Sequence, residues 1–245
     1  MASERPIYLF TDYGVTGPYV GQLHAAIYRQ GYNGRVVDLQ HDAPAFDPVA
    51  SGILLAALMA YLPEEAVVLA VIDPGVGSDR AALRLKMGGR CLIGPDNGLF
   101  ACLFDQIDEV ARIDWMPESL SYSFHGRDWF APVASRVAQG KPVEQTPVAL
   151  DDCVGFSLVP RLEQVIYCDA FGNAMTGLPA VNLSPAAVLG VGAVELRRAG
   201  TFHEVPEGQA FWYENSLGLV EIAVNRGSAA QQLGLSPGDR VLILD

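Results

Sequence analysis

The pattern of apolar and polar positions predicts alternating strands and helices in the first half of the chain. Short apolar runs rich in β-branched residues, each ended by a polar or Gly/Pro turn, predict strands at residues 7–10, 36–39 and 67–72. Segments of helical length lie between these strands, at residues 19–30 and 48–62. Pro63 ends the second helix because proline cannot continue one. Alternation of this kind is typical of a parallel or mixed sheet covered by helices.

The middle of the chain predicts a hairpin, two more helices and then a change of character. Apolar runs at 83–87 and 91–93 flank a Gly-Gly pair and predict the hairpin, and helices are predicted at 99–105 and 130–139. Residues 140–161 contain several prolines and an acidic pair with no helical period. This region therefore indicates a linker between two domains.

The last third of the chain predicts a small all-β domain. Strand-like runs separated by turn residues at short spacing lie at residues 164–168, 188–196, 209–213, 219–224 and 240–244. We therefore expect an α/β domain at residues 1–145, with a mixed or parallel sheet and flanking helices. We expect a linker at 146–162 and an all-β domain at 163–245.

Charge and cysteine content exclude several classes of protein. The chain of 245 residues has 28 Asp and Glu against 16 Lys and Arg, a net charge of −12, whereas nucleic-acid binding needs clustered cations. The four cysteines form no CxxC pair, which argues against a zinc cage. Nothing at the N-terminus is typical of a signal peptide, and the longest uncharged apolar run, 48–63, is shorter than the ~20 residues of a membrane span. We expect a soluble, cytoplasmic protein that binds neither nucleic acid nor membrane.

Polar residues follow several predicted strands directly. Asp12 follows the first strand, Asp73 follows the third, and Asp96 and His125 lie in later Gly-flanked turns. Ligands of such sheets bind at the carboxyl ends of the strands, so these four side chains are expected to converge there. Each of them alone is also compatible with ordinary turn chemistry.

Three chemistries are conceivable at this edge of the sheet. A phosphate cradle is disfavoured because no GxxxxGK[ST] motif is present, and a serine triad is disfavoured because no GxSxG motif is present. A metal-dependent hydrolase is the stronger alternative, although the chain has no HExxH motif. Its candidate ligands are Asp12, His41, Asp42, Asp73, Asp96 and His125.

Motifs spread over nearly the whole chain are similar to those of one family. They are TDYG at 11–14, YVG at 19–21, DPGVGSDR at 73–80, PDNGL at 95–99, FHGRDWFAPVA at 124–134, DAFGN at 169–173 and NSLG at 215–218. In this order they resemble the S-adenosylmethionine hydroxide adenosyltransferases, which are related to the S-adenosylmethionine-dependent chlorinase and fluorinase. One such match would mean little, whereas the ordered set is specific.

The resemblance implies a fold, an assembly and a reaction. The fold is an α/β domain followed by a small β domain. The assembly is a homotrimer whose sites lie between the first domain of one subunit and the second domain of its neighbour. The reaction converts S-adenosyl-L-methionine and water to adenosine and L-methionine, with no metal and no cofactor.

The resemblance also implies roles for single residues. Asp73, Arg80 and His125 match the residues that handle the water. The implied substrate-binding residues are Asp12 at the ribose hydroxyls, Asn173 at the adenine, Asp169 at the methionine amino group, Phe46 and Phe171 as aromatic walls, and Ser216, Glu221 and the backbone of Val224 along the nucleoside pocket. Leu217 stands where the fluorinase has Arg, which leaves the partner of the methionine carboxylate open.

Water is a weak nucleophile, with an unperturbed pKa of about 15.7, so such a site must hold it and share its proton. We expect His125 to be the proton acceptor, because an unperturbed histidine side chain has a pKa near 6.5. Asp73 would orient His125 or bind the water directly. Arg80 would offset the charge of Asp73. The sequence leaves open which of the two takes the proton.

Besides the metal-dependent hydrolase, two alternatives remain at the sequence level. A chlorinase would attack the same carbon with chloride, although a carboxylate at position 73 repels a halide and so favours water. The fluorinase has Tyr at this position and Tyr-Ser where this chain has His125-Gly126, whereas the chlorinase shares the Gly. The other alternative is a protein that binds S-adenosylmethionine or a nucleoside without turnover, which would not need the Asp73, Arg80 and His125 set.

Overall fold

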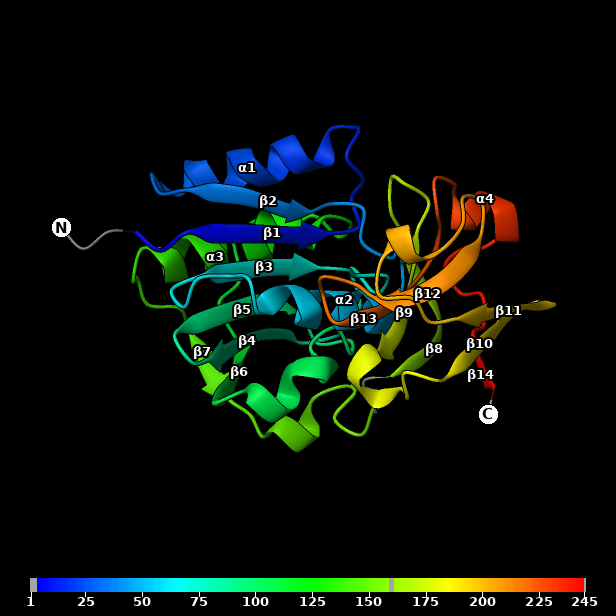
Figure 1. Cartoon of the computed structure of the whole chain (residues 1–245). Helices are drawn as coiled ribbons and strands as arrows, with labels where there is room; N and C mark the ends of the chain where they lie inside the picture. The colour runs from blue at the N-terminus through cyan, green and yellow to red at the C-terminus, as the bar shows by residue number, and fades with distance from the viewer. Residues whose placement is uncertain (1–3, 159–160, 245) are drawn as a thin grey trace. The chain divides into compact units, whose positions relative to one another are not determined.

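The computed structural model describes residues 4–158 and 161–244, and the chain divides between residues 158 and 159 into two units (Figure 1). Both units have their own buried apolar core. In the part of the chain that the structure describes, no helix is long and apolar enough to cross a membrane.

A seven-stranded sheet forms the centre of the first unit, in the order β2-β1-β3-β5-β4-β6-β7. Its strands are β1 Ile7–Thr11, β2 Val36–Gln40, β3 Val67–Val71, β4 Ala82–Met87, β5 Arg90–Pro95, β6 Glu109–Ile113 and β7 Gln145–Pro147. The pairings are parallel from β2 to β5 and antiparallel from β5 to β7. The predicted mixed sheet is therefore confirmed, and the carboxyl ends of β1, β3 and β5 lie at one edge.

Helices cover the sheet on both faces, which agrees with the complete burial of β3. The helices are α1 Tyr19–Arg29, α2 Pro48–Met59 and α3 Ala131–Ala138. Leu23 and Ile27 of α1 share one apolar cluster with Val133 and Val137 of α3 and with Leu9 of the sheet. In Figure 1, α2 lies in front of the sheet and α3 behind it.

The helix boundaries follow local chemistry. Asp47 caps α2 by accepting a hydrogen bond from the Ala50 amide (3.0 Å), and Pro48 suits the first helical position. The helix ends earlier than the predicted residue 62. The predicted helix at 99–105 is a 3-10 helix, η1 Ala101–Gln106, and α3 is preceded by a π-helical turn, η2 Gly126–Phe130.

Most of the region predicted as a linker, 146–162, lies in the first unit. Strand β7 pairs with β6, and the 3-10 helix η3 Leu150–Asp152 follows it. The Val154 amide then donates to the Asp96 carboxylate (2.9 Å). These long-range contacts hold the segment although it has no helical period of its own. Residues 159–160 of the predicted linker lie outside the described residues.

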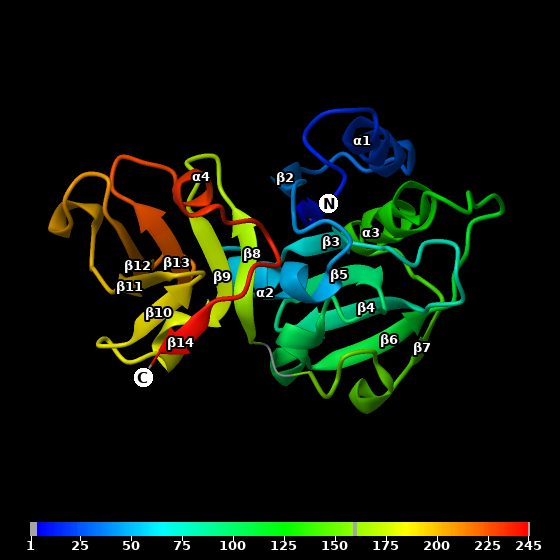
Figure 2. The ribbon, with the colours of Figure 1, turned by 90° about the vertical axis from the view of Figure 1, so that its right-hand side faces the viewer.

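The second unit consists of two antiparallel sheets, in the orders β12-β13-β9-β8 and β11-β10-β14 (Figure 2). Its elements are β8 Leu162–Cys168, β9 Ala174–Pro179, β10 Val188–Val191, β11 Val194–Arg197, β12 Ala210–Glu214, β13 Leu219–Val224, α4 Ala229–Leu233 and β14 Leu242–Leu244, with two 3-10 turns, η4 Ala180–Asn182 and η5 Phe202–Glu204. The predicted all-β domain is confirmed. The predicted single strand at 188–196 is wrong, because a turn at Gly192 (φ 57°) splits it into the β10–β11 hairpin.

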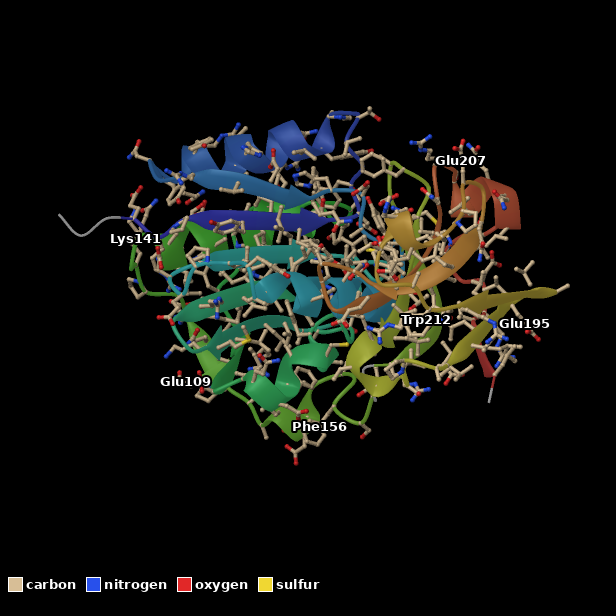
Figure 3. The ribbon with its side chains drawn as sticks, in the orientation of Figure 1. Glu109, Lys141, Phe156, Glu195, Glu207 and Trp212 are labelled. Atoms are coloured by element: carbon tan, nitrogen blue, oxygen red, sulfur yellow. The ribbon has the colours of Figure 1, made fainter. Side chains whose placement is uncertain are left out.

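Trp212, labelled in Figure 3, is fully buried in the apolar core of the second unit. Its indole nitrogen donates to the Ala187 carbonyl (3.0 Å), so the buried polar atom is satisfied. Trp212 is therefore a packing residue of this core.

Candidate active site

A hollow of about 350 Å³ lies in the first unit, where β1 and β3 end. We call it the first hollow; the residues that line it include Asp12, Tyr13, Phe46, Asp73, His125 and Gly126. The parallel pairing of β1 with β3 brings Asp12 and Asp73 to the same edge of the sheet. The convergence expected from strand ends is therefore present for Asp12, Asp73 and His125.

Asp73, Arg80 and His125 form one buried hydrogen-bonded group. The Arg80 Nε donates to Asp73 Oδ1 over 2.9 Å, and Arg80 Nη2 donates to Asp73 Oδ2. The same Nη2 lies 3.0 Å from His125 Nδ1. The guanidinium also lies over the rings of Phe130 and Trp129, at 5.1 and 5.8 Å from their centroids. A planar fork held in this way orients both neighbours.

The protonation of His125 follows from its surroundings. Burial, together with the positive charge of Arg80, lowers the pKa of His125 below its ordinary value of 6.5. The ring is therefore neutral at pH 7. Because the guanidinium group of Arg80 is only a hydrogen-bond donor, His125 Nδ1 accepts the hydrogen bond from Arg80. The single proton of the neutral ring is therefore on Nε2. Asp73 and His125 are among the described residues that line the first hollow, whereas Arg80 is not.

Asp12 and Phe46 form another part of the first hollow. Asp12 accepts a hydrogen bond from the Phe46 amide (3.1 Å), and burial raises the pKa of its carboxyl group. Phe46 has a positive φ of 59°, which is unusual for a bulky residue, and the residue is 78% exposed. Strain of this kind clusters at functional sites, and here it presents an aromatic ring at the rim of the hollow.

His41 and Asp96 have other partners. His41 Nδ1 lies 2.8 Å from the Thr11 hydroxyl and its Nε2 lies 3.0 Å from Asp38, so the ring supports the end of β1. Asp96 accepts the bond from the Val154 amide. Neither residue is among the described residues that line the first hollow, and neither is Asp42. Within residues 4–158 and 161–244, no three His, Cys, Asp or Glu side chains are placed to hold a metal ion.

A separate hollow of about 860 Å³ lies in the second unit, and we call it the second hollow. The candidate residues of the predicted all-β domain all line it; they are Asp169, Phe171, Asn173, Ser216, Glu221 and Val224. Phe171 is 81% exposed. The predicted residues are thus brought together in two groups, one in each unit.

A tight turn holds Asn173 in the second hollow. Asp169 Oδ1 accepts from the amides of Phe171 (2.9 Å) and Asn173 (2.8 Å), and its Oδ2 accepts from Asn173 Nδ2 (2.9 Å). Gly172 has a φ of 82°, and a Cβ there would lie 2.0 Å from the Ser228 hydroxyl oxygen, so the position requires glycine. Among the described residues, the side-chain Oδ1 of Asn173 and the second proton of its Nδ2 have no partner, so both can pair with a ligand edge.

Glu221 is buried behind the second hollow, with only 2% of its surface exposed. It accepts from the Tyr213 hydroxyl and from Asn215 Nδ2 (2.8 Å), and burial raises its pKa. Asn215 Oδ1 in turn accepts from the amides of Leu217 (2.9 Å) and Leu219 (3.0 Å). Glu221 therefore also shapes the loop that presents Ser216.

Sequence reasoning missed Tyr13, Tyr213 and Asn215. Asn215 begins the NSLG motif, so its position in the motif could have identified it. Tyr213 is opposite Glu221 in the β12–β13 pairing, which only the strand register reveals. Tyr13 follows Asp12 directly, but its packing depends on a distant segment, Phe124 to Gly126.

Comparison with known proteins gives matches over both units. Residues 7–147 match the family model described as the SAM hydroxide adenosyltransferase N-terminal domain, and residues 163–242 match that of the C-terminal domain, where SAM is S-adenosyl-L-methionine. The chain is 39% identical to an (R)-S-adenosyl-L-methionine hydrolase of Thermus thermophilus over 98% of its length and 100% of the relative's. It is 36% identical to a protein of the same name from Salinispora arenicola, over 99% of both chains.

Solved structures have the same fold. An uncharacterized conserved protein from Thermotoga maritima superposes with a TM-score of 0.84 at 28% identity, covering 98% of this chain and 100% of that one. A conserved hypothetical protein from Thermus thermophilus superposes with a TM-score of 0.76 at 35% identity, with the same coverage.

Proposed function

Since this chain belongs to the SAM hydroxide adenosyltransferase family, we propose that it hydrolyses S-adenosyl-L-methionine to adenosine and L-methionine. The observation that carries this proposal in the structure is the buried Asp73–Arg80–His125 group, two of whose members face the first hollow beside Asp12. A protein that only bound the nucleoside would not need such a group.

Displacement of the sulfonium by water requires few catalytic groups. The bond from the water oxygen to C5′ forms while the C5′–S bond breaks, and the electron pair of that bond stays on sulfur. The sulfonium therefore leaves as a neutral thioether and needs no general acid. One proton of the water must pass to a base, and the water must be held in line with the breaking bond.

We assign the base role to Asp73. The Nδ1 of His125 accepts from Arg80, and its Nε2 carries the proton, so the neutral ring can donate to the water but has no free lone pair. Each oxygen of Asp73 accepts from Arg80 and keeps a further lone pair for the water. This assignment differs from the hypothesis, based on residue type alone, that His125 takes the proton.

Arg80 is a positioning residue in this proposal. It fixes the carboxylate plane of Asp73 and the tautomer of His125 through the same guanidinium group. Its charge also lowers the pKa of His125, which disfavours the protonated ring. Both effects keep a proton acceptor and a hydrogen-bond donor side by side at the first hollow.

The other predicted residues bind the substrate. Asp12 accepts from the ribose hydroxyls, as acidic residues do in other nucleotide sites. Asn173 pairs with an adenine edge, and Asp169 receives the methionine amino group. Phe46 and Phe171 are exposed rings at the two hollows and form the aromatic walls. Ser216, Glu221 and the Val224 backbone complete the second hollow.

We further propose that the active site is completed in a homotrimer, between the first unit of one subunit and the second unit of its neighbour. The support is that each hollow contains only part of the substrate-binding set and that each has a large exposed ring at its rim. Size-exclusion chromatography with light scattering tests the assembly. Cytoplasmic location and independence of metal and cofactor stay predictions.

Turnover of S-adenosyl-L-methionine in ¹⁸O water, with chromatography and mass spectrometry of the products, tests the reaction. We expect adenosine labelled at its 5′ oxygen, in equal yield with excess chelator. Formation of 5′-chloro-5′-deoxyadenosine in the presence of chloride would instead identify a chlorinase. Loss of activity with chelator would identify a metal-dependent enzyme, and binding without product would identify a binding protein.

A further inference from the structure

The Tyr13 side chain is held firmly beside the residue that follows His125. Its ring packs edge-on against Phe124, with centroids 5.4 Å apart, and lies 6.3 Å from the ring of Tyr19. A Cβ built on Gly126 would lie only 1.9 Å from the Tyr13 hydroxyl oxygen. The hydroxyl therefore occupies the space that a side chain at position 126 would fill.

The Tyr13 hydroxyl has no hydrogen-bond partner among the described residues, although the backbone nitrogen of Tyr13 donates to the Thr11 hydroxyl (3.3 Å). Among the described residues, Arg90 Nε is the only buried side-chain nitrogen or oxygen without a partner, so the Tyr13 hydroxyl oxygen is accessible from the hollow. It is therefore available to a ligand there. Tyr13 lines the first hollow together with Asp73 and His125. Burial and the charges of Asp12 and Asp73 raise its pKa, so the hydroxyl stays protonated at neutral pH.

We propose that the Tyr13 hydroxyl is a further catalytic residue, which accepts a hydrogen bond from the attacking water. This inference rests on the proposed hydrolysis. A water molecule has two protons and two lone pairs in tetrahedral directions. One proton goes to Asp73, one lone pair attacks C5′, and the other lone pair accepts from His125 Nε2. The second proton needs an acceptor, and the Tyr13 oxygen supplies it.

In this arrangement Tyr13 orients the water and undergoes no net proton transfer. The oxygen–C5′ bond forms, the C5′–S bond breaks with its electrons on sulfur, and Asp73 receives the proton of the attacking water. Orientation of the nucleophile contributes to the chemical step and little to substrate affinity. The proposal therefore predicts an effect on kcat rather than on KM.

The substitution Tyr13→Phe removes the oxygen atom and keeps the ring. We expect kcat for S-adenosyl-L-methionine to fall about tenfold or more, which corresponds to the loss of one hydrogen bond to a group that becomes charged. We expect KM and the dissociation constant for adenosine to stay within about twofold of the wild type. The unfolding temperature should stay within about 2 °C of the wild type. Tyr28→Phe, which removes an exposed hydroxyl on α1 outside the first hollow, is the matched control and should keep full activity.

A double-mutant cycle with Gly126→Ala adds a second measurement. The new methyl group must displace the Tyr13 hydroxyl, so we expect this variant to lose kcat as well. In Y13F/G126A the nearest atom to the methyl group is the ring carbon at 3.1 Å, and no hydroxyl is left to displace. The double variant should therefore have about the kcat of Tyr13→Phe alone.

A Tyr13→Phe enzyme with kcat within about twofold of the wild type would overturn the proposal. So would a loss that appears in KM or in adenosine affinity with kcat unchanged, because it would make Tyr13 a binding residue. If Gly126→Ala does not fold, Tyr13→Phe and its adenosine affinity decide the question alone. A wild-type protein without hydrolase activity would refute the proposed function itself. This outcome is distinguishable from failure of the Tyr13 proposal, in which the wild type is active and the Tyr13→Phe enzyme has nearly the same kcat.

Discussion

The substitution Arg80→Met tests the central electrostatic argument of the site. Methionine fills similar space but has no charge and no donors. It removes both bonds to Asp73, the bond to His125 and the ring contacts of the guanidinium. The Asp73 carboxylate then stays buried without its partner, because its side chain is only 5% exposed.

The expected cost follows from that burial. Removing one partner of a buried ion pair costs about 3–5 kcal/mol, whereas replacing both charges by neutral groups is often close to neutral. Arg80→Met should therefore destabilise the first unit by about 3–5 kcal/mol. The double variant D73N/R80M has no unpaired charge and should regain most of that loss. The pKa of His125 should rise in Arg80→Met, because the guanidinium charge is one of the causes that lower it.

Amide hydrogen exchange of the full-length chain measures this effect. Peptides from β1 and β3 report the opening free energy of the first unit separately from the second unit. An NMR titration of the imidazole signals reports the pKa of His125 in the same variants. Steady-state kinetics should show kcat reduced at least about tenfold, since both groups lose their common support.

Two results would refute the reasoning. The first is an opening free energy in Arg80→Met within about 1 kcal/mol of the wild type, which is well below the expected cost of a broken buried pair. The second is a double variant as unstable as Arg80→Met alone, since the loss would then come from packing and not from the unpaired Asp73 charge.

Three further predictions concern pH, binding and packing. Because burial and the neighbouring guanidinium lower the pKa of His125, kcat/KM should be level around pH 7 and fall only below about pH 6.5. The free energy of unfolding should fall over the same range, because on lowering the pH the unfolded chain protonates His125 at a higher pH than the folded chain does. A decline of kcat/KM that begins above about pH 6.5 would contradict this prediction. Asp12→Asn keeps an acceptor for the Phe46 amide but removes the charge, and should weaken adenosine binding about tenfold in calorimetry; equal affinity would remove Asp12 from the ribose site. Gly52→Ala should cost about 1–3 kcal/mol in thermal unfolding, because its Cβ would lie 2.4 Å from the Leu99 carbonyl oxygen. Gly21→Ala, with nothing within 4 Å, should be neutral or stabilising and is the control.

Local pattern was sufficient for the parts of the fold that depend on local interactions. Strands β1 and β3 are apolar runs ended by Thr-Asp and Asp-Pro-Gly, and helix α2 begins at a capping Asp and ends shortly before Pro63. Patterns of this kind act within a few residues, so the sequence reveals them. Placing Asp12 and Asp73 at one edge followed from the same information, because parallel strands end together.

Pairing between distant segments was not accessible in this way. Strands β6 and β7 lie towards one edge of the sheet and were missed. Neither is a strong apolar run; β6 is defined by its pairing with β4, and β7 by its pairing with β6. His41 and Asp96 were plausible ligands by residue type, but the partners that engage them, Asp38, Thr11 and Val154, come from the folded chain.

The sequence by itself determined the two-domain class and the set of residues that the family motifs contain, because both depend on residue type and order. Tertiary structure alone decided how those residues act. The ring proton of His125 is on Nε2 because Arg80, from another loop, donates to Nδ1. The Tyr13 hydroxyl is beside Gly126 because two distant turns pack together. Hydrogen-bond direction and side-chain contact depend on distances in space, which the order of residues along a chain does not contain.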